Sequence, residues 1–268
     1  MPDRGPTTVA GVDALTTDDG PVFAVIGVFD GLHLGHRYLL RQLVYEAERR
    51  HARATVITFD AHPDEVILGA APPLLLDPAD RLRRLGRAGV EVVVVQHFDA
   101  ALRATEYDAF LGRITARTRL AGLLMTPDAA FGHDRRGTPE TVGALAAAQG
   151  WDLVVVPPFE IDGRSVRSSD IRAAIAVGNL AEAKRLLGRP YAVVGTAEAA
   201  ADVEDGTLVR LAPPHALPPD GTWQAAVRAW PADESTPVAI ATEVTVAAGS
   251  IRLGGPAPAA SVEVLFAG

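Results

Sequence analysis

Apolar and polar positions alternate regularly along the first two thirds of the chain. Short apolar runs, typical of buried strands, occupy 22–28, 54–59, 91–95, 120–125 and 153–156. Between them, apolar residues recur at helical spacing over 34–50, from Asp77-Pro78 onward, over 105–118 and over 139–149. This order predicts an α/β fold, a doubly wound parallel sheet whose ligand site lies outside the carboxyl ends of the strands.

The pattern changes after Leu187. Gly188-Arg189-Pro190 ends the last helical segment, and strand-like runs follow at 223–230, 238–246 and 262–266, separated by turns rich in Pro and Gly. We therefore expect two domains, a nucleotide-binding α/β domain over 1–187 and a small all-β barrel over 188–268.

A string rich in glycine and histidine follows the first predicted strand and opens the first predicted helix. It reads Gly27-Val28-Phe29-Asp30-Gly31-Leu32-His33-Leu34-Gly35-His36. A helix N-terminus offers free amides to a phosphate, and glycine lets the backbone approach a ligand closely. His33 and His36 are three residues apart, so both could donate to charge that grows on a phosphoryl group.

Simpler interpretations of these residues remain open. A histidine in a turn is usually a surface or core residue, and a pair at this spacing could ligate a metal, although no third ligand is evident. Asp30 could position the site or only cap the turn. The complete string directly after a strand favours nucleotide chemistry over these readings.

The amino-acid composition limits which side chains can contact phosphate and which partners we expect. The chain has no Cys, one Lys (Lys184) and a net charge of −8, and residues 190–268 hold nine Asp or Glu against three Arg. A nucleic-acid surface needs a basic stripe, so we expect no nucleic-acid partner. The P-loop lysine is missing, so Arg or His must contact phosphate.

No apolar run approaches the ~20 residues of a membrane span, and residues 1–20 lack a signal-peptide pattern. We expect a cytoplasmic protein without a membrane partner; its oligomeric state stays open.

The string resembles the HxGH nucleotidyltransferase superfamily, and in this form the bacterial FAD synthetases, which are bifunctional riboflavin kinase/FMN adenylyltransferases. The resemblance runs in order over 25–191. It includes Thr58-Phe59-Asp60-Ala61-His62-Pro63 (family TFxPHP), Asp128-Ala129-Ala130-Phe131-Gly132 with Arg136-Gly137 (GxDFxFG…RxG), Arg167-Ser168-Ser169-Asp170-Ile171-Arg172 (SSTxIR) and Leu187-Gly188-Arg189-Pro190-Tyr191 (LGRPY).

The resemblance implies roles for individual residues. His33, His36 and Arg172 would be catalytic, and Mg²⁺ would accompany ATP without a protein metal site. ATP would be bound by Gly27, Phe29, Asp30, Gly31, His33, Gly35, His36, Ser168, Ser169 and Arg172. The acceptor, FMN, would be bound by Phe59, His62, Pro63, Asp128 and Phe131. Independently, Ser168 and Ser169 stand where a helix is expected to begin, which favours an anion, although a plain Ser cap beside a surface Arg is also common.

Departures from the family fall mainly on the acceptor side. Ala61 replaces a proline, Ala129 an aromatic residue and Thr126 a glycine, while the kinase motif PTAN is missing. The resemblance therefore implies an ATP-dependent FMN adenylyltransferase that makes FAD and pyrophosphate without riboflavin kinase activity. Two alternatives remain, namely the same mechanism on another phosphorylated acceptor, and a flavin- or nucleotide-binding protein without turnover.

Overall fold

Six parallel strands form the central sheet of the computed structural model, which describes residues 5–199, 206–231 and 239–268. The strand order is β1-β4-β3-β2-β5-β6. The strands are β1 (Thr7–Ala10), β2 (Val22–Ile26), β3 (Arg53–Phe59), β4 (Val92–Gln96), β5 (Leu120–Met125) and β6 (Asp152–Val155). The parallel doubly wound fold expected from the alternation is confirmed.

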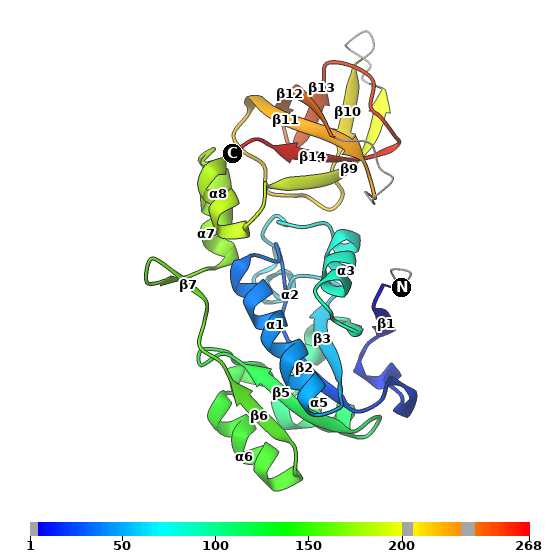
Figure 1. Cartoon of the computed structure of the whole chain (residues 1–268), viewed down its shortest axis with the longest axis vertical. Coiled ribbons are helices and arrows are strands. Elements are labelled where there is room, and N and C mark those ends of the chain that lie inside the picture. The colour runs from blue at the N-terminus through cyan, green and yellow to red at the C-terminus, as the bar shows by residue number, and fades with distance from the viewer. Residues whose placement is uncertain (1–4, 200–205, 232–238) are drawn as a thin grey trace. The chain divides into compact units, whose positions relative to one another are not determined.

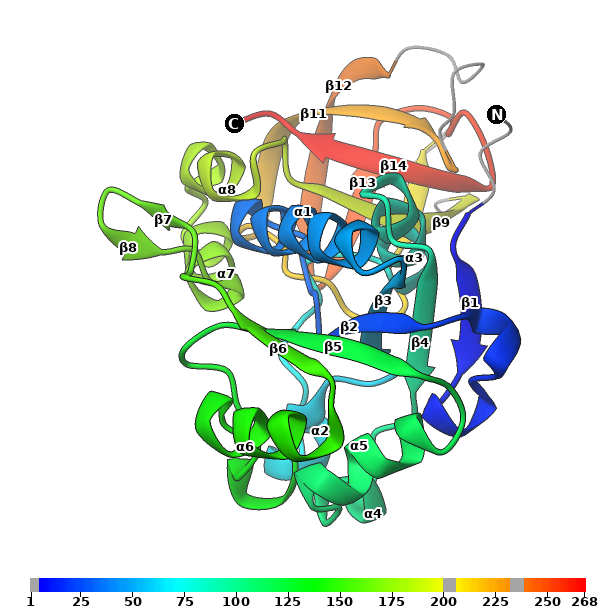
Figure 2. The ribbon, with the colours of Figure 1, turned by 60° about the horizontal axis from the view of Figure 1, so that its bottom comes forward.

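Helices alternate with these strands. They are α1 (Leu34–Arg49), α2 (Pro63–Leu68), α3 (Pro78–Arg87), α4 (Ala100–Arg103), α5 (Tyr107–Thr115) and α6 (Pro139–Gln149). Figure 2 shows α1 on one side of the sheet and α5 and α6 on the other. Asp77 accepts from the amides of Ala79 and Asp80, so the predicted start of α3 is confirmed.

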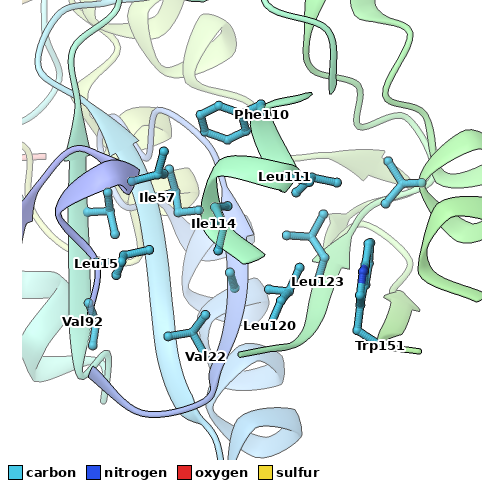
Figure 3. Packing of buried hydrophobic residues seen from close by; sticks show 14 of the residues in the cluster. Leu15, Val22, Ile57, Val92, Phe110, Leu111, Ile114, Leu120, Leu123 and Trp151 are labelled. Carbon is cyan, nitrogen blue, oxygen red and sulfur yellow. The ribbon is translucent and has the colours of Figure 1, made fainter. Parts of the chain in front are cut away.

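The core between the sheet and α5 and α6 is made of alternating strand residues. Val22, Ala24, Ile57 and Leu123 from three strands pack with the buried face of α5 and with Trp151 (Figure 3). The apolar runs of the sequence are continuous because helices cover both faces of a parallel sheet.

Two expectations for this region need correction. The strand β1 was not predicted, because four residues at a sheet edge carry no period of their own; in the part of the chain that the structure describes, β1 pairs with β4 alone. The helix expected over 105–118 is shorter, since Glu106 is extended (φ −64°, ψ 150°) immediately before α5. The motif string consequently follows the second strand of the chain, β2.

A closed barrel forms the C-terminal part of the chain. Its strand order is β10-β13-β12-β11-β14-β9 and all its pairs are antiparallel. Its strands, drawn from yellow to red in Figure 1, are β9 (Ala192–Ala199), β10 (Thr207–Arg210), β11 (Gly221–Ala229), β12 (Ile240–Ala247), β13 (Ser250–Leu253) and β14 (Ser261–Phe266). The predicted barrel is confirmed; Val238, where one strand was expected to begin, lies outside the described residues.

The remaining elements join these two parts. A hairpin of β7 (Glu160–Ile161) and β8 (Arg164–Ser165) is followed by the helices α7 (Ser168–Ala176) and α8 (Leu180–Leu187). Gly188 ends α8 in the left-handed conformation, with φ 68°, as the break after Leu187 predicted. Among the described residues, none of the helices combines the length and the apolar character that a bilayer span requires.

The chain divides into two compact units. Unit 1 comprises Met1–Phe29, Gly35–Pro72 and Leu82–Ser165, and unit 2 comprises Asp30–Leu34, Pro73–Arg81 and Val166–Gly268. The boundary expected between residues 187 and 188 stays a prediction about domains, and residues 1–4 of the first domain lie outside the description.

Candidate nucleotide site and acceptor pocket

The motif string contributes Asp30, Gly31 and His33 to unit 2. Gly31 has φ +81°, and a Cβ there would lie 3.0 Å from the side chain of Leu75. Only glycine meets both conditions without strain. Of the three glycines in the string, Gly31 alone has a positive φ, whereas Gly27 does not and Gly35 lies in α1.

Asp30 is the centre of a buried polar network in unit 2. Its carboxylate accepts from the amide of Leu75 at 3.0 Å and from the guanidinium of Arg172 at 2.5 Å. Arg172 also donates through Nε to the carbonyl of Pro73 at 2.8 Å. The side chains of Asp30 and Arg172 are 4% and 17% exposed, so this ion pair is shielded from water.

The N-terminus of α7 meets the same network. Ser168 begins the helix and donates its hydroxyl to the carbonyl of Asp30 at 3.0 Å. The position before the helix belongs to Arg167, whose side chain makes no capping bond. Neither serine is therefore the N-cap residue. The backbone N–H groups of the first turn point out of the N-terminal end of α7, where an anion is favoured.

His33 is buried and neutral at pH 7. Burial, aided by the positive charge of Arg189, lowers the pKa of His33 to about 4. Arg189 itself donates to the carbonyl of Gly31 at 2.9 Å. The side chain of His33 can thus act as a neutral N–H donor, and an anion close by would raise its pKa again.

The unit 1 residues of the string are arranged around an aromatic contact. Phe29 is buried, has φ 54°, and its ring lies 5.1 Å from the ring of His36. Left-handed backbone in a bulky residue is strained, so the surrounding packing must enforce it. A Cβ on Gly27 would lie 3.1 Å from the Phe29 ring. The small residue at 27 therefore makes room for the ring that packs against His36.

The predicted acceptor residues fall in two places in unit 1. Phe59 ends β3 and packs edge to face against Phe98, with 5.2 Å between ring centroids. His62 caps α2 by accepting from the amide of Asp64 at 3.2 Å, and Pro63 is the first residue of that helix. Asp128 and Phe131 lie in the loop after β5.

A pocket of about 270 Å³ lies at the carboxyl ends of β2 and β5. Asp128 and Phe131 line it together with Thr126, Ala129 and Arg135, whereas Phe59, His62 and Pro63 are not among the described residues of its wall. The structure thus brings two of the five predicted acceptor residues into one pocket. Arg135 was not among the predicted site residues, although in the family's RxG the arginine stands two residues before the glycine, which is the place of Arg135 before Gly137.

No metal cage accompanies these groups. Within residues 5–199, 206–231 and 239–268, no group of three or more His, Cys, Asp or Glu side chains is arranged to hold a metal ion.

Comparisons with known proteins agree with these features. Residues 15–170 match the family model of FAD synthetase. The bifunctional riboflavin kinase/FMN adenylyltransferase of Haemophilus influenzae is 32% identical over 172 residues, which are 63% of this chain and 56% of that protein. An FAD synthetase of Listeria monocytogenes is 25% identical over 209 residues, which are 77% of this chain and 82% of that protein.

The chain thus spans about half the length of the bifunctional relatives that it matches. A crystal structure described as a macrolide-efflux protein from Streptococcus pneumoniae superposes with a TM-score of 0.80 at 22% identity, covering 97% of this chain and 89% of that one. This likeness shows a shared fold.

Proposed function

Because the chain belongs to the FAD synthetase family, we propose that it is an ATP-dependent FMN adenylyltransferase that makes FAD and pyrophosphate. The observation that carries the proposal is the network of Asp30, Ser168 and Arg172, which joins the motif string to the first turn of α7. A cation, the Ser168 hydroxyl and the amides of a helix start are held together there, as electrostatic stabilisation of a phosphoryl group requires.

In the proposed reaction, a phosphate oxygen of FMN attacks the α-phosphorus of ATP. The new P–O bond forms as the bond from the α-phosphorus to the α,β-bridging oxygen breaks, and pyrophosphate leaves with those electrons. His33 and His36 donate hydrogen bonds to the phosphate oxygens, while Ser168, Ser169 and Arg172 hold the β- and γ-phosphates. Mg²⁺ neutralises part of the triphosphate charge when it is bound.

The barrel carries no riboflavin kinase activity in this proposal. Its inward-facing residues are apolar and buried, among them Val193, Val227, Val244 and Phe266. Glu263 is 3% exposed and accepts from Nε of Arg228 across the strand pair at 2.6 Å. The buried apolar residues and the pairing of Glu263 with Arg228 support a structural role, and the sequence has no PTAN motif.

One observation favours an acceptor other than FMN as the second candidate. Two of the three departures from the family pattern, Thr126 and Ala129, line the unit 1 pocket. Changes in a pocket wall alter the shape that a substrate must match. A different phosphorylated acceptor would leave the chemistry at the α-phosphorus unchanged.

The full chain tests the proposal directly. It is incubated with ATP, Mg²⁺ and FMN, and FAD and pyrophosphate are measured by chromatography and a coupled assay. We expect both products in equal amounts, and His36→Asn should lower the rate at least about 100-fold by removing a transition-state donor. His51→Asn is the matched control, because His51 is exposed at the other end of α1.

ATP binding without FAD formation would refute the FMN assignment. Pyrophosphate release with other phosphorylated acceptors would then identify the second candidate, and no release with any of them would indicate a binding protein. FMN formed from riboflavin and ATP would contradict the proposed loss of kinase activity.

A further inference from the structure

The short segment that precedes α3 in unit 2 is bonded through its backbone to the buried ion pair of the candidate site. The amide of Leu75 donates to the carboxylate of Asp30 at 3.0 Å. The carbonyl of Pro73 accepts from Nε of Arg172 at 2.8 Å. The backbone of Leu74, which stands between these two residues, bonds instead to the loop that joins β10 and β11.

This barrel loop, residues 213–216, holds Leu74 by two backbone hydrogen bonds. The amide of Leu74 donates to the carbonyl of Pro214 at 2.9 Å, and the amide of Ala216 donates to the carbonyl of Leu74 at 2.8 Å. Leu74 and His215 thereby form a parallel β-bridge. Consecutive residues of extended chain direct their backbone groups to opposite sides. The barrel loop therefore holds one side of the segment, and the buried ion pair holds the other.

Two buried side chains fix the shape of the barrel loop. The hydroxyl of Tyr191, a residue that is 1% exposed, donates to the carbonyl of Ala216 at 2.5 Å. Nδ1 of His215 lies 2.8 Å from the carbonyl of Pro213, which can only accept, so this nitrogen carries a proton. Burial lowers the pKa of His215, so the ring is neutral at pH 7. Nε2 has no hydrogen-bond partner in the described part of the chain, and the ring therefore bonds to the loop itself.

The segment determines how the guanidinium of Arg172 is oriented. A guanidinium has five N–H donors in one plane. Bonds to the carbonyl of Pro73 and to the carboxylate of Asp30 fix this plane and leave further donors for a phosphate. A misplacement of about 1 Å in a positioning group can cost a large part of its effect on a ligand. A change in the loop would thus reach the phosphate through the backbone at 73–75.

We propose that the barrel loop is a positioning element of the nucleotide site, and that Tyr191 and His215 are positioning residues for Asp30 and Arg172. This inference rests on the proposed function, because it takes the triphosphate of ATP as the ligand of that site. The barrel then takes part in nucleotide binding without a group that touches the ligand. Loss of either side chain weakens ATP binding and leaves the acceptor pocket of unit 1 unchanged.

Equilibrium binding of ATP with Mg²⁺, in the absence of FMN, tests the assignment. Isothermal titration calorimetry gives the Kd of ATP for the wild type, Tyr191→Phe, His215→Ala and His215→Asn. We expect Tyr191→Phe and His215→Ala to raise this Kd about fivefold or more, the size of one lost buried hydrogen bond. His215→Asn should stay within about twofold of the wild type, because its amide nitrogen can replace Nδ1 as the donor.

Val244→Ala is the control for a general loss of barrel stability. Val244 is 1% exposed in the barrel interior, so its truncation leaves a cavity and lowers the Tm. The Kd of ATP should not change in this variant. A rise in Kd equal to that of Tyr191→Phe would overturn the proposal, as would a wild-type Kd in both Tyr191→Phe and His215→Ala. A His215→Asn variant as weak as His215→Ala would overturn the role of the Nδ1 bond.

Steady-state turnover separates this inference from the proposed function. For Tyr191→Phe we expect the KM for ATP to rise about fivefold or more, with the KM for FMN within about twofold of the wild type. A rise in the KM for FMN instead overturns the positioning role. If the wild type binds ATP, the variants bind it more weakly and no FAD is formed, the proposed function fails while the positioning role stands. A wild type that binds no ATP overturns both.

Discussion

Two sets of aspartate and arginine, one in each unit, differ in how their charges are used. In unit 2, Asp30 and Arg172 pair with each other and with the backbone of Leu75 and Pro73, largely away from water. In unit 1, Asp128 and Arg135 line one pocket, both are exposed, and no ion pair joins them.

The difference separates structural from recognition roles. A buried pair is strongly coupled to folding, because removal of one partner leaves the other charge without compensation. An exposed arginine without a counter-ion contributes little to stability and keeps its charge for a ligand. The first set thus connects the fold with the proposed triphosphate site, whereas the second set is expected to act on the acceptor alone.

The largest expected effect on stability is that of Asp30→Ala. It leaves Arg172 without its carboxylate and the amide of Leu75 without its acceptor, so we expect a loss of about 3–5 kcal/mol in the free energy of unfolding. Urea titration measures this quantity. The matched control is Asp128→Ala, for which we expect less than about 1 kcal/mol. Equal losses for the two variants would contradict the distinction between the sets.

The next largest effect is on the pH dependence of the free energy of unfolding, through the titration of His33. Its pKa of about 4 in the folded chain lies below the ordinary value of 6.5, so below pH 6.5 the unfolded chain takes up the proton first. Stability from this group is complete above pH 6.5 and is lost as the pH falls toward 4, by up to roughly 3 kcal/mol.

Urea titrations at pH 7, 6, 5 and 4 for the wild type and His33→Gln test this prediction. The variant should lose less stability than the wild type across the interval. Burial also lowers the pKa of His215, so His215 adds a slope of the same sign, and only the difference between the two chains reports on His33. Parallel curves would show that His33 titrates normally.

The smallest expected effect is that of Arg135→Gln on stability. Since Arg135 is exposed and has no ion pair among the described residues, we expect a change within about 0.5 kcal/mol. Thermal unfolding of the variant beside Arg136→Gln and the wild type provides the measurement. A drop comparable with that of Asp30→Ala would place Arg135 in the folding framework and remove the contrast with Arg172.

Much of the fold could be predicted because its signals are local. The apolar runs of β3 and β5 and the Pro-led start of α6 mark elements that short-range sequence determines. The predictions were weaker where an element depends on a distant partner. The strand β1 pairs with β4, more than 80 residues away along the chain, and the start of α5 depends on the extended backbone of Glu106.

The candidate site shows the same division. The string at residues 27–36 indicated nucleotide chemistry, because its glycines and histidines lie within ten consecutive residues directly after a predicted strand. Which groups these residues contact was decided by tertiary structure. Arg172 and Ser168 reach Asp30 across 142 and 138 residues, and no local pattern carries such separations.

By itself, the sequence determined the α/β class, the all-β C-terminal part and the motif that indicates a phosphate ligand. Tertiary structure alone decided which arginine is paired with a carboxylate and which faces a pocket. The physical reason is that a charge is defined by its neighbours, since burial and counter-ions set both its cost and its availability. Arg135 and Arg172 are the same amino acid in the sequence, and they differ only in the residues that the folded chain places around them.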